Sequence, residues 1–149
     1  MKIPHGLFRL INMVMVLMLR SPAHRLFSGS ILAIRYTGVK SGRRLTVPAR
    51  YLVDNETVHV VTSRDTRWWP NFASPSNAEV LLAGRWVPAS IHATPDSPVA
   101  AEPILRRMWA QHPSDAAYMD VKLNDGEPDP EDLRRALKTA VLLSIERQA

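Results

Sequence analysis

The sequence predicts one α+β domain built around a mainly antiparallel β-barrel, with helices near both ends of the chain and between hairpins. Its 149 residues suit a single domain with one core. Hydrophobic residues make up 46% and charged residues 22%, which is typical of a folded protein rather than a disordered one. Short apolar runs joined by tight turns recur along the chain and indicate antiparallel strands.

The longest apolar run covers residues 7–19 and should be helical, since Pro4 suits a first turn and Ser21-Pro22 ends it. It is shorter than the roughly 20 residues needed to span a bilayer. Three roles stay open: a helix packed on its own domain, a signal-peptide core without a clear cleavage site, or an interfacial helix. In the last case residues 7–19 make a peripheral membrane contact, and anionic headgroups meet Arg9, Arg20 and Arg25.

Further elements follow in order. Ser21 caps a short helix over 22–28, and strands are expected at 31–37, 45–53 and 57–62. A second hairpin comprises 79–82 and 86–92, a helix follows at 98–111, and 124–130 forms an acidic loop. A helix at 130–137 and a strand at 139–145 complete the domain. Pro48 cannot donate a ladder hydrogen bond, so its strand should lie at an edge or carry a bulge.

Charge is distributed unevenly. Residues 1–53 contain nine Lys or Arg and no Asp or Glu, whereas residues 115–132 contain seven acids and one base. The first third therefore favours an anionic partner, which could be a phosphate-bearing small molecule, a membrane surface or nucleic acid. The aromatic residues do not alternate with Lys and Arg, and the late acids oppose DNA, so no nucleic-acid partner is expected.

Several kinds of chemistry are disfavoured. The absence of cysteine removes disulfides, thiolate metal sites and cysteine nucleophiles, and it fits a cytoplasmic location. The five histidines are scattered, and although His59 and His92 could share a sheet face, no metal site is predicted. The late acids do not follow EF-hand spacing, and no G-x-S-x-G elbow is present.

The turn at 37–44 is the first candidate site. Gly38 and Gly42 allow backbone N–H groups to converge, while the side chains around them add hydroxyl and cationic donors: Lys40, Ser41, Arg43 and Arg44. Such a turn can bind phosphate, although the spacing is not that of a Walker A loop. The alternative is an ordinary solvated hairpin.

The second candidate is the segment 62–72, which contains the adjacent Trp68 and Trp69. A tryptophan pair can wall a flat ring system. In the alternative, one indole belongs to the core and the other covers the barrel end. Asn71 could cap or orient this loop.

Together these segments resemble the deazaflavin-dependent nitroreductase family of actinobacteria. The resemblance rests on T-G-V-K-S-G-R at 37–43 with T-V-P at 46–48, on W-W-x-N-F at 68–72, and on R-S-P-x-H-R-L at 20–26. It covers about residues 15–92. It implies a split β-barrel related to pyridoxamine phosphate oxidases, with the helices packed outside the barrel.

The resemblance also implies binding of coenzyme F420, an 8-hydroxy-5-deazaflavin with a phosphate and an oligoglutamate tail. The turn would hold the phosphate and tail through Lys40, Ser41 and Gly42. Thr46, Val47 and Pro48 would supply backbone contacts to the ring, while the pocket would be closed by Thr62, Ser63, Arg64, Trp68, Trp69 and Asn71. Related branches of this fold bind FMN, haem or biliverdin, and FMN is the alternative cofactor.

Two departures from the family pattern stand out. Val39 occupies a position where relatives commonly carry Arg, and Arg43 or Arg44 would replace that contact. Asn77-Ala78 stands where Asn-Pro is usual, after a spacing from Asn71 that looks longer.

The implied activity is transfer of a hydride from reduced F420 to an electron-poor quinone, enone or nitro compound. Tyr118 is the candidate catalytic proton donor, with surface packing as its alternative role. Peripheral membrane association would favour a quinone acceptor, and a homodimer is a further expectation. The competing hypothesis is a non-catalytic F420-, flavin- or lipid-binding protein on the same barrel.

Overall fold

The computed structural model of the chain describes residues 5–20 and 30–148. The helix predicted at 22–28 and most of the R-S-P-x-H-R-L motif lie outside these residues. Within them, the predicted strands and long helices are confirmed, with shifted boundaries. The N-terminal run forms helix α1 (His5–Arg20).

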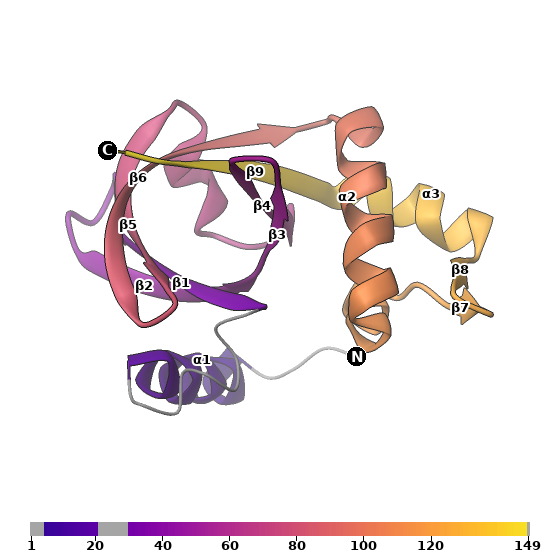
Figure 1. Cartoon of the computed structure of the whole chain (residues 1–149), viewed down its shortest axis with the longest axis horizontal. Helices are drawn as coiled ribbons and strands as arrows, with labels where there is room; N and C mark the ends of the chain where they lie inside the picture. Colours follow the sequence, from indigo (N-terminus) through magenta and orange to yellow (C-terminus); the bar gives the residue numbers. More distant parts are fainter. Residues whose placement is uncertain (1–4, 21–29, 149) are drawn as a thin grey trace.

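One seven-stranded antiparallel sheet dominates the fold and curls into a barrel (Figure 1). Its strand order is β2-β1-β5-β6-β9-β4-β3, so β2 and β3 are the edges. The strands are β1 (Ile31–Thr37), β2 (Arg44–Arg50), β3 (Leu52–Asp54), β4 (Thr57–Ser63), β5 (Ser76–Leu82), β6 (Arg85–Pro95) and β9 (Ala140–Arg147). Pro48 lies in edge strand β2, as its missing N–H requires.

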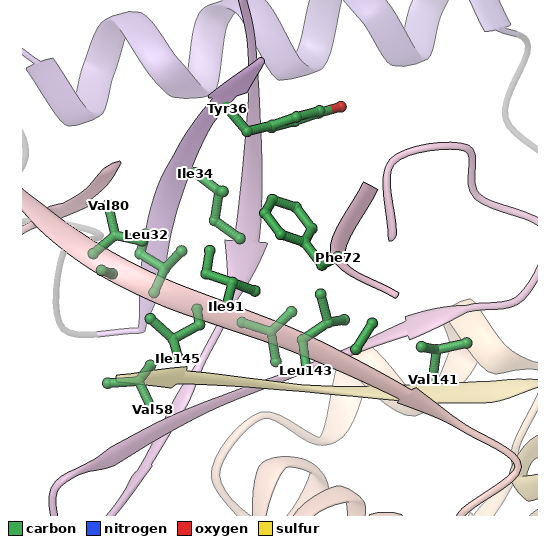
Figure 2. Packing of buried hydrophobic residues seen from close by; sticks show 13 residues of the cluster. Leu32, Ile34, Tyr36, Val58, Phe72, Val80, Ile91, Val141, Leu143 and Ile145 are labelled. Atoms are coloured by element: carbon green, nitrogen blue, oxygen red, sulfur yellow. The ribbon is translucent and has the colours of Figure 1, made fainter. Parts of the chain in front are cut away.

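Alternate residues of each strand point into the barrel, because successive side chains face opposite sides of a sheet. Leu32 and Ile34 of β1, Ile91 of β6 and Leu143 of β9 are fully buried there (Figure 2). Phe72, from the segment between β4 and β5, is 1% exposed and belongs to this cluster. The barrel interior is therefore apolar and filled.

The strand predicted at 45–53 is divided at Tyr51. Its first part pairs with β1, as in Pro48 with Ala33, whereas its second part pairs with β4, as in Leu52 with His59. The chain thus turns a barrel corner at Tyr51, whose N–H bonds the Ser30 carbonyl at 3.0 Å. Sequence alternation cannot reveal such a change of partner.

Two other predictions need correction. Strands β5 and β6 are longer than expected, because β6 pairs with β5 on one side and with β9 on the other. The acidic loop contains the short strands β7 (Leu123–Asn124) and β8 (Glu127–Pro128), paired around Asp125-Gly126. Both turn residues have positive φ, a conformation that Asp-Gly favours in hairpins.

Two helical layers flank the barrel (Figure 1). Helix α1 packs on the outer side of β1 and β2, with Val16 against Ala33 and Leu81. On the other side lie α2 (Pro98–Gln111), the 3-10 helix η3 (Pro113–Met119) and α3 (Pro130–Thr139). The Asp129 side chain caps α3 by accepting a hydrogen bond from the Asp132 N–H at 3.1 Å.

Helix α1 has a second apolar face. Leu10, Met13, Val14 and Leu17 follow helical i, i+3, i+4, i+7 spacing and are 45–58% exposed. Packing on its own domain, one of the three predicted roles, is therefore confirmed for the opposite face only. Across residues 5–20 and 30–148, no helix combines the length and apolarity that a membrane span requires.

Candidate functional site

The predicted glycine turn joins β1 to β2 and is tightly closed. The Gly38 N–H donates to the Arg43 carbonyl at 2.8 Å, and the Gly42 N–H donates to the Gly38 carbonyl at 2.9 Å. Gly42 has a φ of +68°, where a side chain would be strained. The Arg43 N–H bonds the Ser41 hydroxyl at 3.2 Å. The turn is thus held in shape by its own bonds.

This turn leaves donors available to a ligand. Within the described part of the chain, the backbone N–H groups of Lys40 and Ser41 have no hydrogen-bond partner, and the side chains of Lys40 and Arg43 have no ion pair. All three residues are exposed. Free amides beside two unpaired cations suit an oxyanion, so the donor set fits the phosphate end of the predicted cofactor.

Asn71 joins the two predicted segments. Its Oδ1 accepts a hydrogen bond from the Val39 N–H at 2.8 Å, and its Nδ2 donates to the Trp68 carbonyl at 2.9 Å. One side chain therefore ties the glycine turn to the tryptophan segment, 32 residues away in the sequence. The prediction that Asn71 orients this loop is confirmed.

The tryptophan segment continues into the 3-10 helix η2 (Trp69–Phe72). Trp68 and Trp69 are both half-buried against the barrel core, so neither is a fully buried core residue. The rings of Trp68 and Phe72 meet edge to face, with their centroids 6.2 Å apart. The Trp69 indole N–H donates to the Arg64 carbonyl at 3.1 Å. Each indole is held in place while keeping part of its surface open to solvent.

The start of this segment is held by local bonds. The hydroxyls of Thr62 and Thr66 lie 3.1 Å apart, and Thr66 bonds the Ser63 carbonyl through both its N–H and its hydroxyl. Arg64 points elsewhere, because its guanidinium binds the Asp96 carboxylate at 2.7 Å. That hydrogen bond lowers the pKa of Asp96.

Strand β2 carries the predicted ring contacts at Thr46, Val47 and Pro48. Because β2 is an edge strand, one of its sides faces no neighbouring strand, and its backbone groups there can bond a ligand. Thr46 is exposed, whereas Val47 packs partly against the barrel core. This arrangement fits backbone recognition of a flat heterocycle, with Pro48 offering only its carbonyl.

An arginine pair next to the turn was not predicted. The Arg35 Nε and Nη2 bind the Glu79 carboxylate at 3.2 and 2.9 Å, and the Arg44 Nη2 binds its Oε1 at 2.6 Å. The hydrogen bonds, first from Arg35 and then from Arg44, lower the pKa of Glu79. Arg35 also lies over the Trp86 ring, 3.9 Å from its centroid.

Beside this cluster is a pocket of about 210 Å³, called the fork pocket here because β1 and β5 separate at it. Their pairing ends at Arg35 and Glu79, after which each strand follows its other neighbour. The lining residues are Arg35, Tyr36, Thr37, Arg44, Asn77, Ala78 and Glu79. Arg44 is the predicted binding residue that lines it.

Tyr36 is a second residue that sequence reasoning missed. It is 8% exposed and meets the Phe72 ring edge-on, with centroids 5.4 Å apart. Burial raises the pKa of its hydroxyl, so the hydroxyl is protonated at neutral pH. Tyr36 lies on the same face of β1 as Leu32 and Ile34 (Figure 2). It also lines the fork pocket, which forms only where β1 and β5 separate.

A larger pocket, about 650 Å³, lies between α2 and α3, and none of the predicted site residues lines it. Tyr118, the predicted proton donor, is 74% exposed on η3, which packs against α2. The structure thus places Tyr118 in the helical layer and does not bring it to the turn and tryptophan segment.

His59 and His92 do share a sheet face. Both pair with Ser144, one from each side, so the three side chains form a row outside the barrel. No group of three metal-ligating side chains is found within residues 5–20 and 30–148.

The Asn77-Ala78 departure falls within β5, where Asn77 accepts a hydrogen bond from Gln148 at 2.9 Å.

No protein-family model and no curated protein matches the sequence. Solved structures do match. The general stress FMN/FAD-binding protein of Xanthomonas citri is 16% identical, with 83% of this chain and 79% of that chain covered and a TM-score of 0.53. A pyridoxamine 5'-phosphate oxidase-related, FMN-binding protein of Nostoc punctiforme is 18% identical, with 99% and 83% covered and a TM-score of 0.53.

A third structure, described as a domain-swapped dimer, is 16% identical, with 90% of this chain and 93% of that chain covered and a TM-score of 0.53. At these identities the likeness concerns the fold. It agrees with the curled antiparallel sheet, its edge strand β2 and the helices packed outside it. The chain has the α+β split β-barrel fold of the flavin-binding proteins it resembles.

Proposed function

We propose that this chain is an F420-dependent oxidoreductase that passes a hydride from reduced deazaflavin to an electron-poor quinone, enone or nitro compound. The observation that carries the proposal is the hydrogen bond between the Val39 N–H and Asn71 Oδ1. It links the two motifs on which the resemblance to deazaflavin-dependent nitroreductases rests. Two of the similar split barrels bind flavin nucleotides, which supports a tricyclic redox cofactor on this fold.

Each part of the site has a role in this proposal. The free amides of Lys40 and Ser41, with the Lys40 and Arg43 side chains, bind the phosphate and the start of the acidic tail. The open edge of β2 bonds the heteroatoms of the ring, and Trp68 and Trp69 shelter it from water. The cofactor supplies the hydride, while the protein holds the ring and acceptor in register.

The test is a titration of the purified protein with F420, FMN and haem, followed by turnover assays. We expect F420 to bind, and reduced F420 to be consumed when menadione is added. Binding without consumption of any quinone, enone or nitro acceptor would select the non-catalytic alternative. Preferred binding of FMN would select an FMN-dependent protein, as in the two flavin-binding structures above.

An Asn71→Ala variant tests the observation directly. Losing the Asn71 side chain releases the Val39 N–H and the Trp68 carbonyl from their partner. We expect F420 binding to weaken about tenfold, since one hydrogen bond contributes about 1 kcal/mol and the turn also loses its anchor. Asn124→Ala is the matched control, because this exposed asparagine lies in the short strand β7 and lines neither the turn nor the fork pocket.

We also propose a homodimer, because strand β2 has no neighbouring strand on one side and a second chain could cover that edge. A similar structure of known domain-swapped dimeric form supports this state. Peripheral membrane contact through the exposed face of α1 is a separate proposal, and it would make a lipid-soluble quinone the preferred acceptor.

A further inference from the structure

The fork pocket contains an unusual balance of charge. Two arginines, Arg35 and Arg44, converge on the single carboxylate of Glu79. The turn that begins next to the pocket adds Lys40 and Arg43, which have no ion pair within the described part of the chain. Glu79 is therefore the acid that offsets this cationic end of the barrel.

The two arginines differ in how firmly they are held. Arg35 is bidentate on Glu79, stacks on Trp86 and has a side chain only 23% exposed. Arg44 makes a single bond to Glu79, and its side chain is 65% exposed. Arg44 can therefore change its rotamer to bind another anion, whereas Arg35 remains paired with Glu79.

The pocket itself has the size of a subsite. Its volume, about 210 Å³, is below the roughly 300–1,000 Å³ typical of sites for whole drug-sized ligands. Thr37 and Arg44, which line it, are also the paired residues of β1 and β2 that flank the glycine turn. A group bound here would thus adjoin a ligand held on the turn.

We propose that Glu79 is an internal counterion in an oxyanion subsite, and that a phosphate group of an anionic ligand displaces it from Arg44. The incoming oxyanion takes the Arg44 guanidinium, and Glu79 keeps its bidentate pair with Arg35. The competition lowers affinity for every anion. It selects against ligands with a single negative charge, because only a group that carries several charges offsets the lost bond.

The inference concerns this chain whichever cofactor it binds, so inorganic pyrophosphate is the probe. Pyrophosphate is titrated into the wild type and Glu79→Gln by calorimetry at constant ionic strength. We expect the Glu79→Gln variant to bind pyrophosphate about tenfold more tightly, because Arg44 no longer has a charged competitor. Glu79→Gln combined with Arg44→Gln should lose that gain.

Glu102→Gln is the matched control, since Glu102 also pairs with an arginine, Arg106 at 3.3 Å, but in the helical layer. It changes net charge equally and should leave the affinity unchanged. An equal gain in Glu102→Gln would show a general charge effect and overturn the proposal. So would unchanged or weaker binding in Glu79→Gln, or no pyrophosphate binding by any variant.

A second measurement on the unmodified chain protects against a variant that fails to fold. Arginine Nε–Hε resonances are followed by NMR while pyrophosphate is added. We expect the Arg44 resonance to shift well beyond that of Arg35, because only Arg44 changes partner. An unmoved Arg44 resonance at saturating pyrophosphate would contradict the displacement.

Discussion

The barrel interior and the barrel end that carries the glycine turn are built from opposite kinds of contact. Inside, side chains such as Leu32, Ile34 and Leu143 are fully buried within one hydrophobic cluster. At the end, position is set by a few directed hydrogen bonds, and several donors are left unused. Substitutions in the two regions should therefore separate stability from binding.

Phe72 connects the two regions and should give the largest effect. Phe72→Ala removes a fully buried ring that contacts Tyr36 and Trp68. We expect the free energy of unfolding to fall by about 3–5 kcal/mol, the usual cost of such a truncation. Urea denaturation measures it, with the exposed Val99→Ala as control. A loss within 0.5 kcal/mol of that control would mean that Phe72 is not part of the core.

Charge reversal at the turn should weaken cofactor binding and leave the stability of the fold nearly unchanged. Lys40→Glu with Arg43→Glu should weaken F420 binding by about 3 kcal/mol or more, since each charge-assisted contact contributes at least about 1.5 kcal/mol. The melting temperature should change little, because neither side chain has an ion pair within the described residues. Fluorescence titration gives the affinity.

The control for that prediction makes the same change in net charge at another place in the molecule. Lys138→Glu with Arg147→Glu reverses two exposed cations on α3 and β9. If this control weakens F420 binding as much as the turn variant does, the overall charge of the protein rather than the turn is responsible. If neither variant changes the affinity, the anionic end of the cofactor lies elsewhere.

Helix α1 offers a third kind of surface, apolar yet exposed. Leu10→Asp with Leu17→Asp places charges on its outer face, where these side chains are 51% and 58% exposed. We expect the fraction of protein that sediments with anionic lipid vesicles to fall several-fold. The free energy of unfolding should change by about 0.5 kcal/mol or less. Retained sedimentation in this double variant would contradict a membrane role for α1.

The smallest expected effect is a pH dependence at His59, outside the barrel. Burial, the main cause, lowers the pKa of His59, and its Nδ1 is buried with no hydrogen-bond partner among residues 5–20 and 30–148. The unfolded chain therefore binds a proton more readily than the folded one below about pH 6.5. The free energy of unfolding should rise with pH up to that value and then level off.

Urea unfolding of the wild type and of His59→Gln across this range measures the contribution. The free energy of unfolding of the wild type, minus that of His59→Gln, should fall as pH drops below about 6.5 and stay constant above it. A constant difference at every pH would mean that His59 titrates alike in the folded and unfolded chains.

The sequence by itself determined the local elements. Alternating apolar residues specify β1 and β4, Asp129 specifies the start of α3, and Pro48 confines β2 to an edge. The glycine turn was also predictable, because positive φ at Gly42 is a local requirement. Each of these features depends on residues a few positions apart, so the linear pattern contains it.

Only the tertiary structure decided which distant residues meet. The Asn71–Val39 bond, the Arg35–Glu79–Arg44 cluster and the corner at Tyr51 all depend on how strands far apart in sequence are registered. Shifting a strand by one residue turns its side chains to the other face. The linear sequence therefore proposed the two halves of the site, and closure of the sheet into a barrel brought them together.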